Sequence, residues 1–466
     1  MRNTLASRGL AVFSFSSALI FAACAGSGSS GSGTGGSVGT GGNGSGGAIG
    51  TGGNGSGGAI GTGGAVGTGG AVGTGGINGS GGGSGGNGTG GGAGGVASGG
   101  TTGTGGNGTG GAATGGATGT GGQAGGAAGS SGFTPYLCPS GMASPSASAI
   151  PAGSTATRIP GAPAVDNFDG SQGNGFTNVE GPVWIGDALY FSEMLGSPNP
   201  PPARIFKIDS TDNVTQFYPS GAGGDSGSNG MAVDQNGNLV TANHGVGGIV
   251  RFTIPGATKT TIIDSYNGSR FDSPNDLTIR SDGTIYFTDP NFQALSTNGK
   301  YPQPTTGVYM VLPGSSTATE LLSTISNPNG ITLSLDEKTL YVGSGSGVNG
   351  YAVNADGTIV TTPTAIDGAN LNNNNTDGMA IDCAGDLYVV RVNTHDIDVV
   401  SFGSTHPSPT ATGSHLALIS GLPGSGQVTN AAFGGTDHKT LYVTVQGNTP
   451  AKGVFKLTMP IPGMPY

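Results

Sequence analysis

The chain is poor in charged and aromatic residues and has almost no cysteine. Only 9% of its 466 residues are charged and 6% are aromatic, whereas ordinary soluble domains are roughly 25% charged. The 15 Lys and Arg form no cluster and are outnumbered by 25 Asp and Glu. Such a chain lacks the basic surface that binds nucleic acid or anionic membranes, so we expect neither as a partner. The three cysteines show no spacing typical of a thiolate metal site.

Long apolar runs are also missing. The run over residues 9–22 is shorter than the ~20 residues that a transmembrane helix needs. It follows two arginines and ends in small residues before Cys24, which is the pattern of a secretory signal. The end of this run resembles a bacterial lipobox, with Phe21 where Leu is usual. We therefore expect residues 1–24 to be a lipoprotein-type signal with Cys24 lipidated, and the alternative is an ordinary cleaved signal.

Glycine is the residue in excess. Most of the 100 Gly lie upstream of Phe133, and residues 25–132 consist mainly of Gly, Thr, Ser, Asn and Ala. This composition buries too little apolar surface to offset the entropy of ordering, so a disordered tether is predicted. A flexible chain of this length spans roughly 50–60 Å. Together with Cys24, it predicts an exported protein that is either held at the outer membrane or cell surface or secreted, and whose membrane contact is limited to a lipid anchor.

Residues 133–466 are long enough for one large domain, and similar segments recur along them. The segments begin at Glu180, Asn229, Asn275, Asn329, Asp377 and Thr429. Successive starts lie 46 to 54 residues apart, which is the spacing of four-stranded propeller blades. In each segment a short apolar strand, a turn rich in Asp, Asn and Gly, and a β-branched or aromatic strand form the inner hairpin of a blade. We predict an all-β, monomeric six-bladed β-propeller over residues 133–466.

The last blade lacks chain for its outer strand. Little sequence remains after GVFKLTM near the C-terminus, so a segment within residues 156–179 is predicted to supply that strand and close the ring. A β-sandwich is the all-β alternative, but a near-constant period argues against it.

Blades repeat around one axis, so the residues that lead the innermost strands should converge on one end of the channel. We call these residues the oxygen ring; they are Glu180, Asn229, Asn275, Asn329, Asp377 and the pair Thr429 and Asn430. Carboxylates crowded together in a channel repel one another and lose hydration, and a divalent cation relieves both costs by accepting their oxygens. Oxygen ligands favour Ca²⁺, with Mg²⁺, Mn²⁺ or Zn²⁺ as alternatives. The competing interpretation is that Asn and Asp merely form turns here.

Five motifs, EGPVW, SPNDLTIRSDGTIYFTDP, NPNGITLSLDEKTLYV, TDGMAIDCAGDLYV and PGMPY, resemble the senescence marker protein/gluconolactonase family, and most of all its bacterial gluconolactonase branch. The resemblance covers residues 176–466. It implies a propeller with one divalent cation that hydrolyses a small-molecule lactone. It places the metal ligands at Glu180, Asn329 and Asp377 and a substrate contact at Asn275.

The same resemblance implies further substrate contacts. His244 in ANHG and Arg270 before SPND match positions near the family's substrate, and we add Asn229 of the oxygen ring. The cation would polarise the lactone carbonyl and lower the pKa of water. Asp377 is the expected general base, with Glu180 as the second catalytic carboxylate. The alternatives are a surface-tethered propeller that binds without catalysis, or an esterase acting on another lactone or a phosphotriester.

Two questions stay open at this level. Cys138 and Cys383 form either a disulfide or two buried free thiols. Asp276 stands where the other blades have Gly, and it either braces the oxygen ring or binds beside it. The remaining histidines of the domain are expected to be surface residues in loops, namely His395, His406, His415 and His438.

Overall fold

The computed structural model describes most of the predicted propeller domain. Its described residues are 133–160, 176, 178–195, 199–220, 226–323, 325–367, 371, 374–403, 411–423, 426–446 and 452–465. The predicted signal segment with Cys24 and the predicted linker 25–132 lie outside them, so these assignments stay predictions. Among the described residues, no helix has the length and apolar character needed to cross a membrane.

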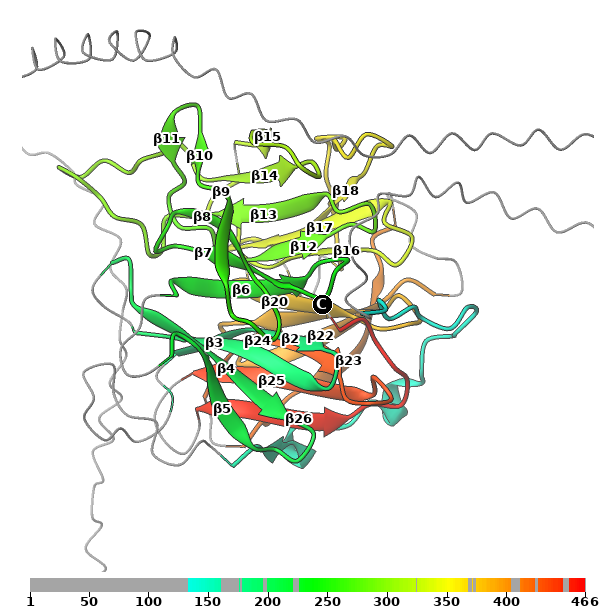
Figure 1. Ribbon diagram of the computed structural model, residues 1–466. Helices are drawn as coiled ribbons and strands as arrows, with labels where there is room; N and C mark the ends of the chain where they lie inside the picture. The colour runs from blue at the N-terminus through cyan, green and yellow to red at the C-terminus, as the bar shows by residue number, and fades with distance from the viewer. Residues whose placement is uncertain are drawn as a thin grey trace, which may run out of the picture. The chain divides into compact units, whose positions relative to one another are not determined.

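The described strands form six four-stranded antiparallel sheets and one two-stranded ribbon, and the sheets surround a common centre (Figure 1). This confirms the predicted six-bladed β-propeller. Blades 1 to 3 consist of β2 (Asn178–Ile185), β3 (Ala188–Met194), β4 (Ala203–Asp209) and β5 (Val214–Tyr218); β6 (Ser228–Val233), β7 (Leu239–Asn243), β8 (Gly248–Phe252) and β9 (Lys259–Ile263); and β12 (Leu277–Ile279), β13 (Ile285–Asp289), β14 (Gly307–Val311) and β15 (Ala318–Leu322).

Blades 4 to 6 follow the same order. They consist of β16 (Ile331–Leu333), β17 (Thr339–Ser344), β18 (Gly347–Ala352) and β19 (Thr364–Ala365); β20 (Thr376–Ile381), β21 (Leu387–Arg391), β22 (Asp396–Ser401) and β23 (Ser414–Ile419); and β24 (Gln427–Gly434), β25 (Thr440–Gln446), β26 (Gly453–Thr458) and β1 (Thr157–Arg158). The ribbon joins β10 (Ser265–Tyr266) to β11 (Ser269–Arg270) ahead of blade 3. Two short 3-10 helices, Ala147–Ala149 and Gly153–Thr155, precede β1.

Both ends of the domain meet in blade 6, as predicted. Strand β1 pairs with β26 through Thr157 opposite Lys456 and Arg158 opposite Phe455. The Arg158 Nε also donates to the Lys452 carbonyl at 2.9 Å. This pairing gives blade 6 its fourth strand, so segments from both ends of the domain are held in one sheet.

The hydrophobic core lies between neighbouring blades. Inner strands such as β3 are buried at every position, because each face is covered by another blade, and they therefore read as continuous apolar runs. The Trp184 and Tyr442 rings, for example, stack at 5.7 Å between blades 1 and 6. The outermost strands, such as β9, are partly exposed. Inner strands buried on both faces make a rigid frame for residues at the channel.

The first and last described segments of the domain meet at one end of the channel. A disulfide joins Cys138 of the N-terminal arm (residues 133–141) to Cys383 in the turn between β20 and β21, so the alternative of two free thiols is wrong. The C-terminal tail reaches the same place, because the Pro462 carbonyl accepts from the Cys383 amide at 2.8 Å and the Pro465 carbonyl from the Trp184 amide at 3.0 Å. The oxygen ring lies at the opposite end of the channel, where the innermost strands begin.

Candidate metal and active site

The innermost strands begin at one end of the channel, and neighbouring blades touch there all round the ring. A Cβ added to Gly378 of blade 5 would overlap the Asn430 side chain of blade 6. The other five seams are joined by hydrogen bonds: Ser192 Oγ to Asn229 O (2.9 Å), Gly230 N to Asn275 O (2.7 Å), Thr288 Oγ1 to Asn329 O (2.7 Å), Ser344 N to Thr376 Oγ1 (3.0 Å) and Thr429 Oγ1 to Val179 O (2.7 Å). The residues of the oxygen ring are thus gathered at this end.

β-Bulges shape the strand starts. The pairing of the two inner strands shifts register between Glu180 and Val183 in blade 1, and between Thr376 and Met379 in blade 5. Blades 2 and 6 have equivalent shifts. A bulge bends the strand and re-aims the residue beside it, which here is Glu180 or Asp377.

Asp276, whose role the sequence left open, lies at this ring. A Cβ on Gly230 would overlap the Asp276 carboxylate, just as one on Gly378 would overlap Asn430. Blades 3 and 6 therefore insert a side chain where the other blades carry Gly, and the glycine of the preceding blade makes room for it. The Asp276 Oδ1 accepts from its neighbour Leu277 N at 2.9 Å.

Three carboxyl groups share this buried end of the channel. Burial raises the pKa of Asp276 to about 7, although hydrogen bonds from the Leu277 and Ile331 backbone and the Asn430 side chain oppose the shift. Burial and then the charge of Asp276 raise the pKa of Asp377 well above its usual range. Burial, Asp377 and Asp276, in that order, do the same for Glu180. Without a counter-charge, the three groups cannot all ionise at neutral pH at low cost.

The residues fit a hard divalent cation. Asn329 is 7% exposed, and its Oδ1 is buried without a hydrogen-bond partner among the described residues. The Asn329 side chain also hydrogen bonds Asp377, and the Glu180 Oε2 accepts from Gly181 N at 3.2 Å. An unsatisfied amide oxygen beside crowded carboxylates is an oxygen-only donor set, which suits Ca²⁺, Mg²⁺ or Mn²⁺.

The predicted substrate residues lie on the neighbouring blades. Asn229 and Asn275 of the oxygen ring are 2% and 8% exposed. His244 directly follows β7 and Arg270 ends β11, and the Arg270 Nη2 donates to the His244 carbonyl at 2.8 Å. His244 is fully buried, and burial followed by the charge of Arg270 lowers its pKa to about 3. Its imidazole is therefore neutral at physiological pH.

Sequence reasoning missed Asp289, which holds the segment before Asn275 in place. Its Oδ1 accepts from Ser273 N at 2.8 Å and its Oδ2 from Asp272 N at 2.9 Å, while Ser273 Oγ donates to the Pro290 carbonyl at 2.7 Å. The signal was present in the repeats. The second strand of each of blades 1 to 5 carries a buried polar residue at its last position or, in blade 1, at its last but one: Glu193, Asn243, Asp289, Ser344 and Arg391. All five strands belong to the repeated segments aligned in the sequence, but the polar residue near the end of each strand was not considered as a functional position.

Two of the histidines expected in surface loops differ from that prediction, His415 because it lies in a strand and His438 because it is partly buried, although it does lie in the turn between β24 and β25. His415 belongs to strand β23, and its Nδ1 lies 2.6 Å from the Asp398 Oδ1. His438 is partly buried and stacks on Tyr136 of the N-terminal arm, with ring centroids 3.7 Å apart. His395 is exposed in the turn after β21, as expected, and His406 lies outside the described residues.

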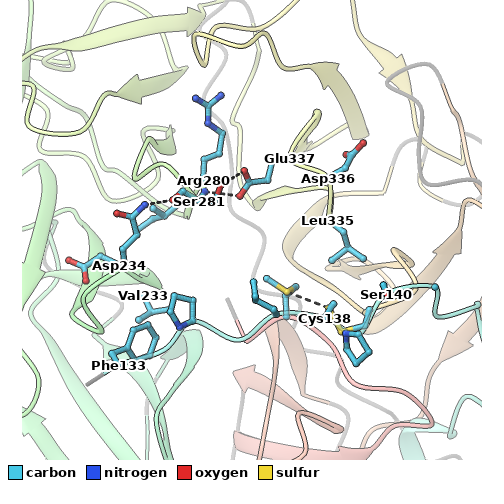
Figure 2. Close-up of a pocket in the computed structure, with 18 residues that line it drawn as sticks. Phe133, Cys138, Ser140, Val233, Asp234, Arg280, Ser281, Leu335, Asp336 and Glu337 are labelled. Atoms are coloured by element: carbon cyan, nitrogen blue, oxygen red, sulfur yellow. Dashed lines mark hydrogen bonds between the residues drawn. A yellow bond between two sulfur atoms is a disulfide. The ribbon is translucent and has the colours of Figure 1, made fainter. Parts of the chain in front are cut away.

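A cavity of about 650 Å³ lies at the other end of the channel, between the N-terminal arm and the inner turns of blades 2 to 5. Figure 2 shows Phe133 and Cys138 of the arm across this cavity from Ser281 and Glu337. Glu337 is engaged, since Ser281 donates to it from both its amide and its hydroxyl at 2.6 Å. None of the oxygen-ring residues is among the described residues that line the cavity, so it is separate from the predicted site.

Comparison with known proteins gives consistent matches. The sequence profile of the SMP-30/Gluconolactonase/LRE-like region matches residues 179–447, which is more than half of the chain. The gluconolactonase of Zymomonas mobilis is 29% identical over 298 residues, 58% of this chain and 76% of that protein. The lactonase drp35 of Staphylococcus haemolyticus is 32% identical over 170 residues, 35% of this chain and 47% of that protein.

The match to solved structures concerns the fold. A crystal structure of a provisionally assigned gluconolactonase superposes with a TM-score of 0.52 at 22% identity, covering 68% of this chain and 96% of that one. At this identity the likeness supports the propeller alone.

Proposed function

Because the chain belongs to the SMP-30/gluconolactonase/LRE-like family, we propose that it hydrolyses the ester bond of a sugar lactone of the gluconolactone type at the oxygen ring. One observation carries the proposal: Glu180, Asp276 and Asp377 lie at one buried end of the channel, where burial raises the pKa of each and the charge of Asp276 adds to the shifts of the other two. Buried carboxyl groups with raised pKa values in a channel are typical of a site that binds a cation and transfers protons. The Zymomonas mobilis relative, a gluconolactonase, indicates the substrate class.

The cation of this proposal would be held by Glu180, Asn329 and Asp377. Ca²⁺ is our first choice, with Mg²⁺, Mn²⁺ and Zn²⁺ as alternatives. When bound, it would supply Lewis acidity that polarises the lactone carbonyl and makes a water more acidic. Asn329 would contribute the buried Oδ1 that otherwise lacks a hydrogen-bond partner among the described residues.

The two proposed catalytic carboxylates have similar surroundings. Glu180 receives hydrogen bonds from the Gly181 backbone and the Asn430 side chain, and Asp377 receives them from the Gly378 backbone and the Asn329 side chain. Burial and then the charge of Asp276 make Asp377 more basic than a free carboxylate. We propose that Asp377 acts as the general base and accepts a proton from the attacking water.

Substrate positioning falls to the polar residues of blades 2 and 3. The Asn275 amide can donate to the oxygen that becomes negative as water adds to the carbonyl, and Asn229 lies on the adjoining blade. We place the sugar hydroxyls against Asn229 and Arg270. His244 stays uncharged, so it would serve as a neutral hydrogen-bonding group rather than as an acid.

The test is proton release from glucono-1,5-lactone by the full chain, with and without chelator. We expect Asp377→Asn to reduce the rate at least 100-fold and chelator to abolish activity until Ca²⁺ is restored. Asp209→Asn, at a half-buried aspartate that ends β4 in blade 1, is the matched control and should keep full activity. If chelated enzyme and Asp377→Asn both stay fully active, the cation mechanism is wrong. If no divalent ion supports lactone opening, the chain is better described as a binding propeller.

We also propose that the propeller acts outside the cytoplasm, as an envelope lipoprotein or a secreted monomer. The Cys138–Cys383 disulfide supports this location, since disulfides persist in oxidising compartments. Cys24 would carry the lipid. Incorporation of labelled fatty acid into the wild-type chain, and its loss in Cys24→Ser, tests the anchor; equal labelling of both would refute it.

A further inference from the structure

A second group of metal-type side chains lies between blades 4 and 5, apart from the oxygen ring. Asp367 follows strand β19, Asp398 lies in β22 and His415 in β23. One ligand atom of each residue lies within 4.8 Å of the corresponding atoms of the other two. We call these three residues the inter-blade cluster.

The backbone places these residues together. The register of β22 and β23 shifts between Val399 and Val400, so that His415 pairs opposite Val400 while its ring reaches the neighbouring Asp398. A bulge of this kind re-aims a side chain. From blade 4, the Asp367 amide donates to the Thr412 carbonyl at 2.7 Å, which ties Asp367 to the segment that leads into β23. The cluster is thus built from two blades rather than from one mobile loop.

Asp398 provides an independent observation in favour of a bound cation. Its side chain is 0% exposed, and its Oδ2 is buried without a hydrogen-bond partner among the described residues. The Arg391 Nη1 lies 4.0 Å from that oxygen, but the Arg391 Nε and Nη2 are committed to Asp396 at 2.7 and 2.9 Å. A buried carboxylate oxygen left in this state is costly unless a cation engages it.

The local charge also favours a cation. The titratable groups that meet here are the carboxyls of Asp367, Asp396 and Asp398, the Arg391 guanidinium and the His415 imidazole. Three carboxylates against one guanidinium leave an excess of two negative charges when His415 is neutral. A divalent ion would balance that excess.

We propose that Asp367, Asp398 and His415 bind a divalent transition-metal ion of the Zn²⁺ type. One imidazole nitrogen with two carboxylate oxygens is a donor set that zinc accepts, at about 2.0–2.2 Å, whereas Ca²⁺ takes oxygen ligands alone. Binding would replace the proton shared by His415 Nδ1 and Asp398 Oδ1. The His415 side chain is 40% exposed, so an ion can enter from solvent, and three protein ligands leave one position for water. The ion would link blade 4 to the blade that carries Asp377.

The experiment uses the full chain saturated with Ca²⁺, which occupies an oxygen-only site, and titrates it with Zn²⁺ by calorimetry. We expect one Zn²⁺ per chain in the wild type and an affinity at least 100-fold lower in His415→Ala. The matched control is His395→Ala, because His395 is an exposed histidine of the same blade outside the inter-blade cluster; it should bind as the wild type does. Circular dichroism of His415→Ala would verify that the variant folds.

Two results would overturn the proposal. One is the absence of Zn²⁺ uptake by the Ca²⁺-loaded wild type. The other is an unchanged affinity in His415→Ala, or an equal loss in His395→Ala, which would mark adventitious binding to surface histidines. Asp367→Asn provides a second variant on the blade 4 side, and we expect at least a 10-fold weaker affinity. Lactone hydrolysis takes no part in these readouts, so their failure is independent of the proposed function.

Discussion

Replacing Asp276 by Asn should change how the stability of the metal-free chain depends on pH. The folded chain holds the Asp276 proton up to about pH 7, while an unfolded chain releases it near 3.8. A raised pKa of this sign means that the Asp276 contribution is fully present below pH 4 and is lost as the pH rises towards 7. Asn cannot ionise, so the variant escapes this loss.

The size of the effect follows from the shift. Each unit of pKa difference corresponds to about 1.4 kcal/mol, so a shift of roughly three units gives up to about 4 kcal/mol. The free energy of unfolding of Asp276→Asn minus that of the wild type should therefore rise by up to this amount between pH 4 and pH 7 and then level off. Removing the Asp276 charge also eases ionisation of Asp377, which acts in the same direction.

Urea unfolding in chelator at pH 4 to 8 measures this difference. The single Trp of the chain, Trp184, is buried against Tyr442 and reports unfolding by fluorescence. Asp209→Asn is the matched control, because hydrogen bonds from Thr211 and then Asn213 lower the Asp209 pKa to about 2. Its difference from wild type should be flat from pH 5 to 8. A flat difference for Asp276→Asn as well would refute the reasoning about the ring.

Three further outcomes are expected. Exchanging Cys138 and Cys383 for Ser opens a loop of 245 residues and should cost up to about 5 kcal/mol in urea unfolding; an unchanged midpoint would contradict this. Gly378→Ala forces a Cβ into the Asn430 side-chain amide of the next blade; it should lower the free energy of unfolding by ~1–3 kcal/mol and weaken Ca²⁺ binding. Its control is Gly345→Ala, whose Cβ would meet only one atom at 3.9 Å and which should have neither effect. The His244 ring signal in NMR should not titrate between pH 5 and 8, because its pKa is lowered to about 3; its stability contribution is lost only as the pH falls from about 6.5 towards 3, and a midpoint near 6.5 would contradict the prediction.

The repeat pattern was enough to predict the propeller, because blade spacing and strand alternation are local properties of the sequence. Closure by a segment within residues 156–179 could also be predicted, since counting strands left blade 6 one short, and β1 fills that place. Register likewise predicted that Glu180, Asn329 and Asp377 share one end of the channel. These inferences need only periodicity and the geometry of a ring.

The features that the repeat pattern could not predict depend on contacts between strands or blades that are distant in the sequence. The position of Asp276 is decided by the space that Gly230 leaves in the blade before it, and no pattern within blade 3 carries that information. His415 was predicted to lie in a loop because its strand alternates weakly, and the bulge that turns it towards Asp398 depends on pairing with β22. The partner of Cys138 is 245 residues away, and an even pair of cysteines alone does not prove a bond.

The disulfide precedes the pairing of β1 with β26 along the chain, and this order has a mechanical consequence. Cys138 precedes β1, and β1 is held to β26 by only two residue pairs. Tension applied to the chain upstream of Cys138 is therefore delivered through a covalent bond to Cys383 in blade 5, and the short seam in blade 6 carries none of it. Reduction would redirect the same load to that seam, where the two residue pairs would separate one after the other. The disulfide thus carries a pulling force applied at the N-terminal side, so that β1 stays paired with β26.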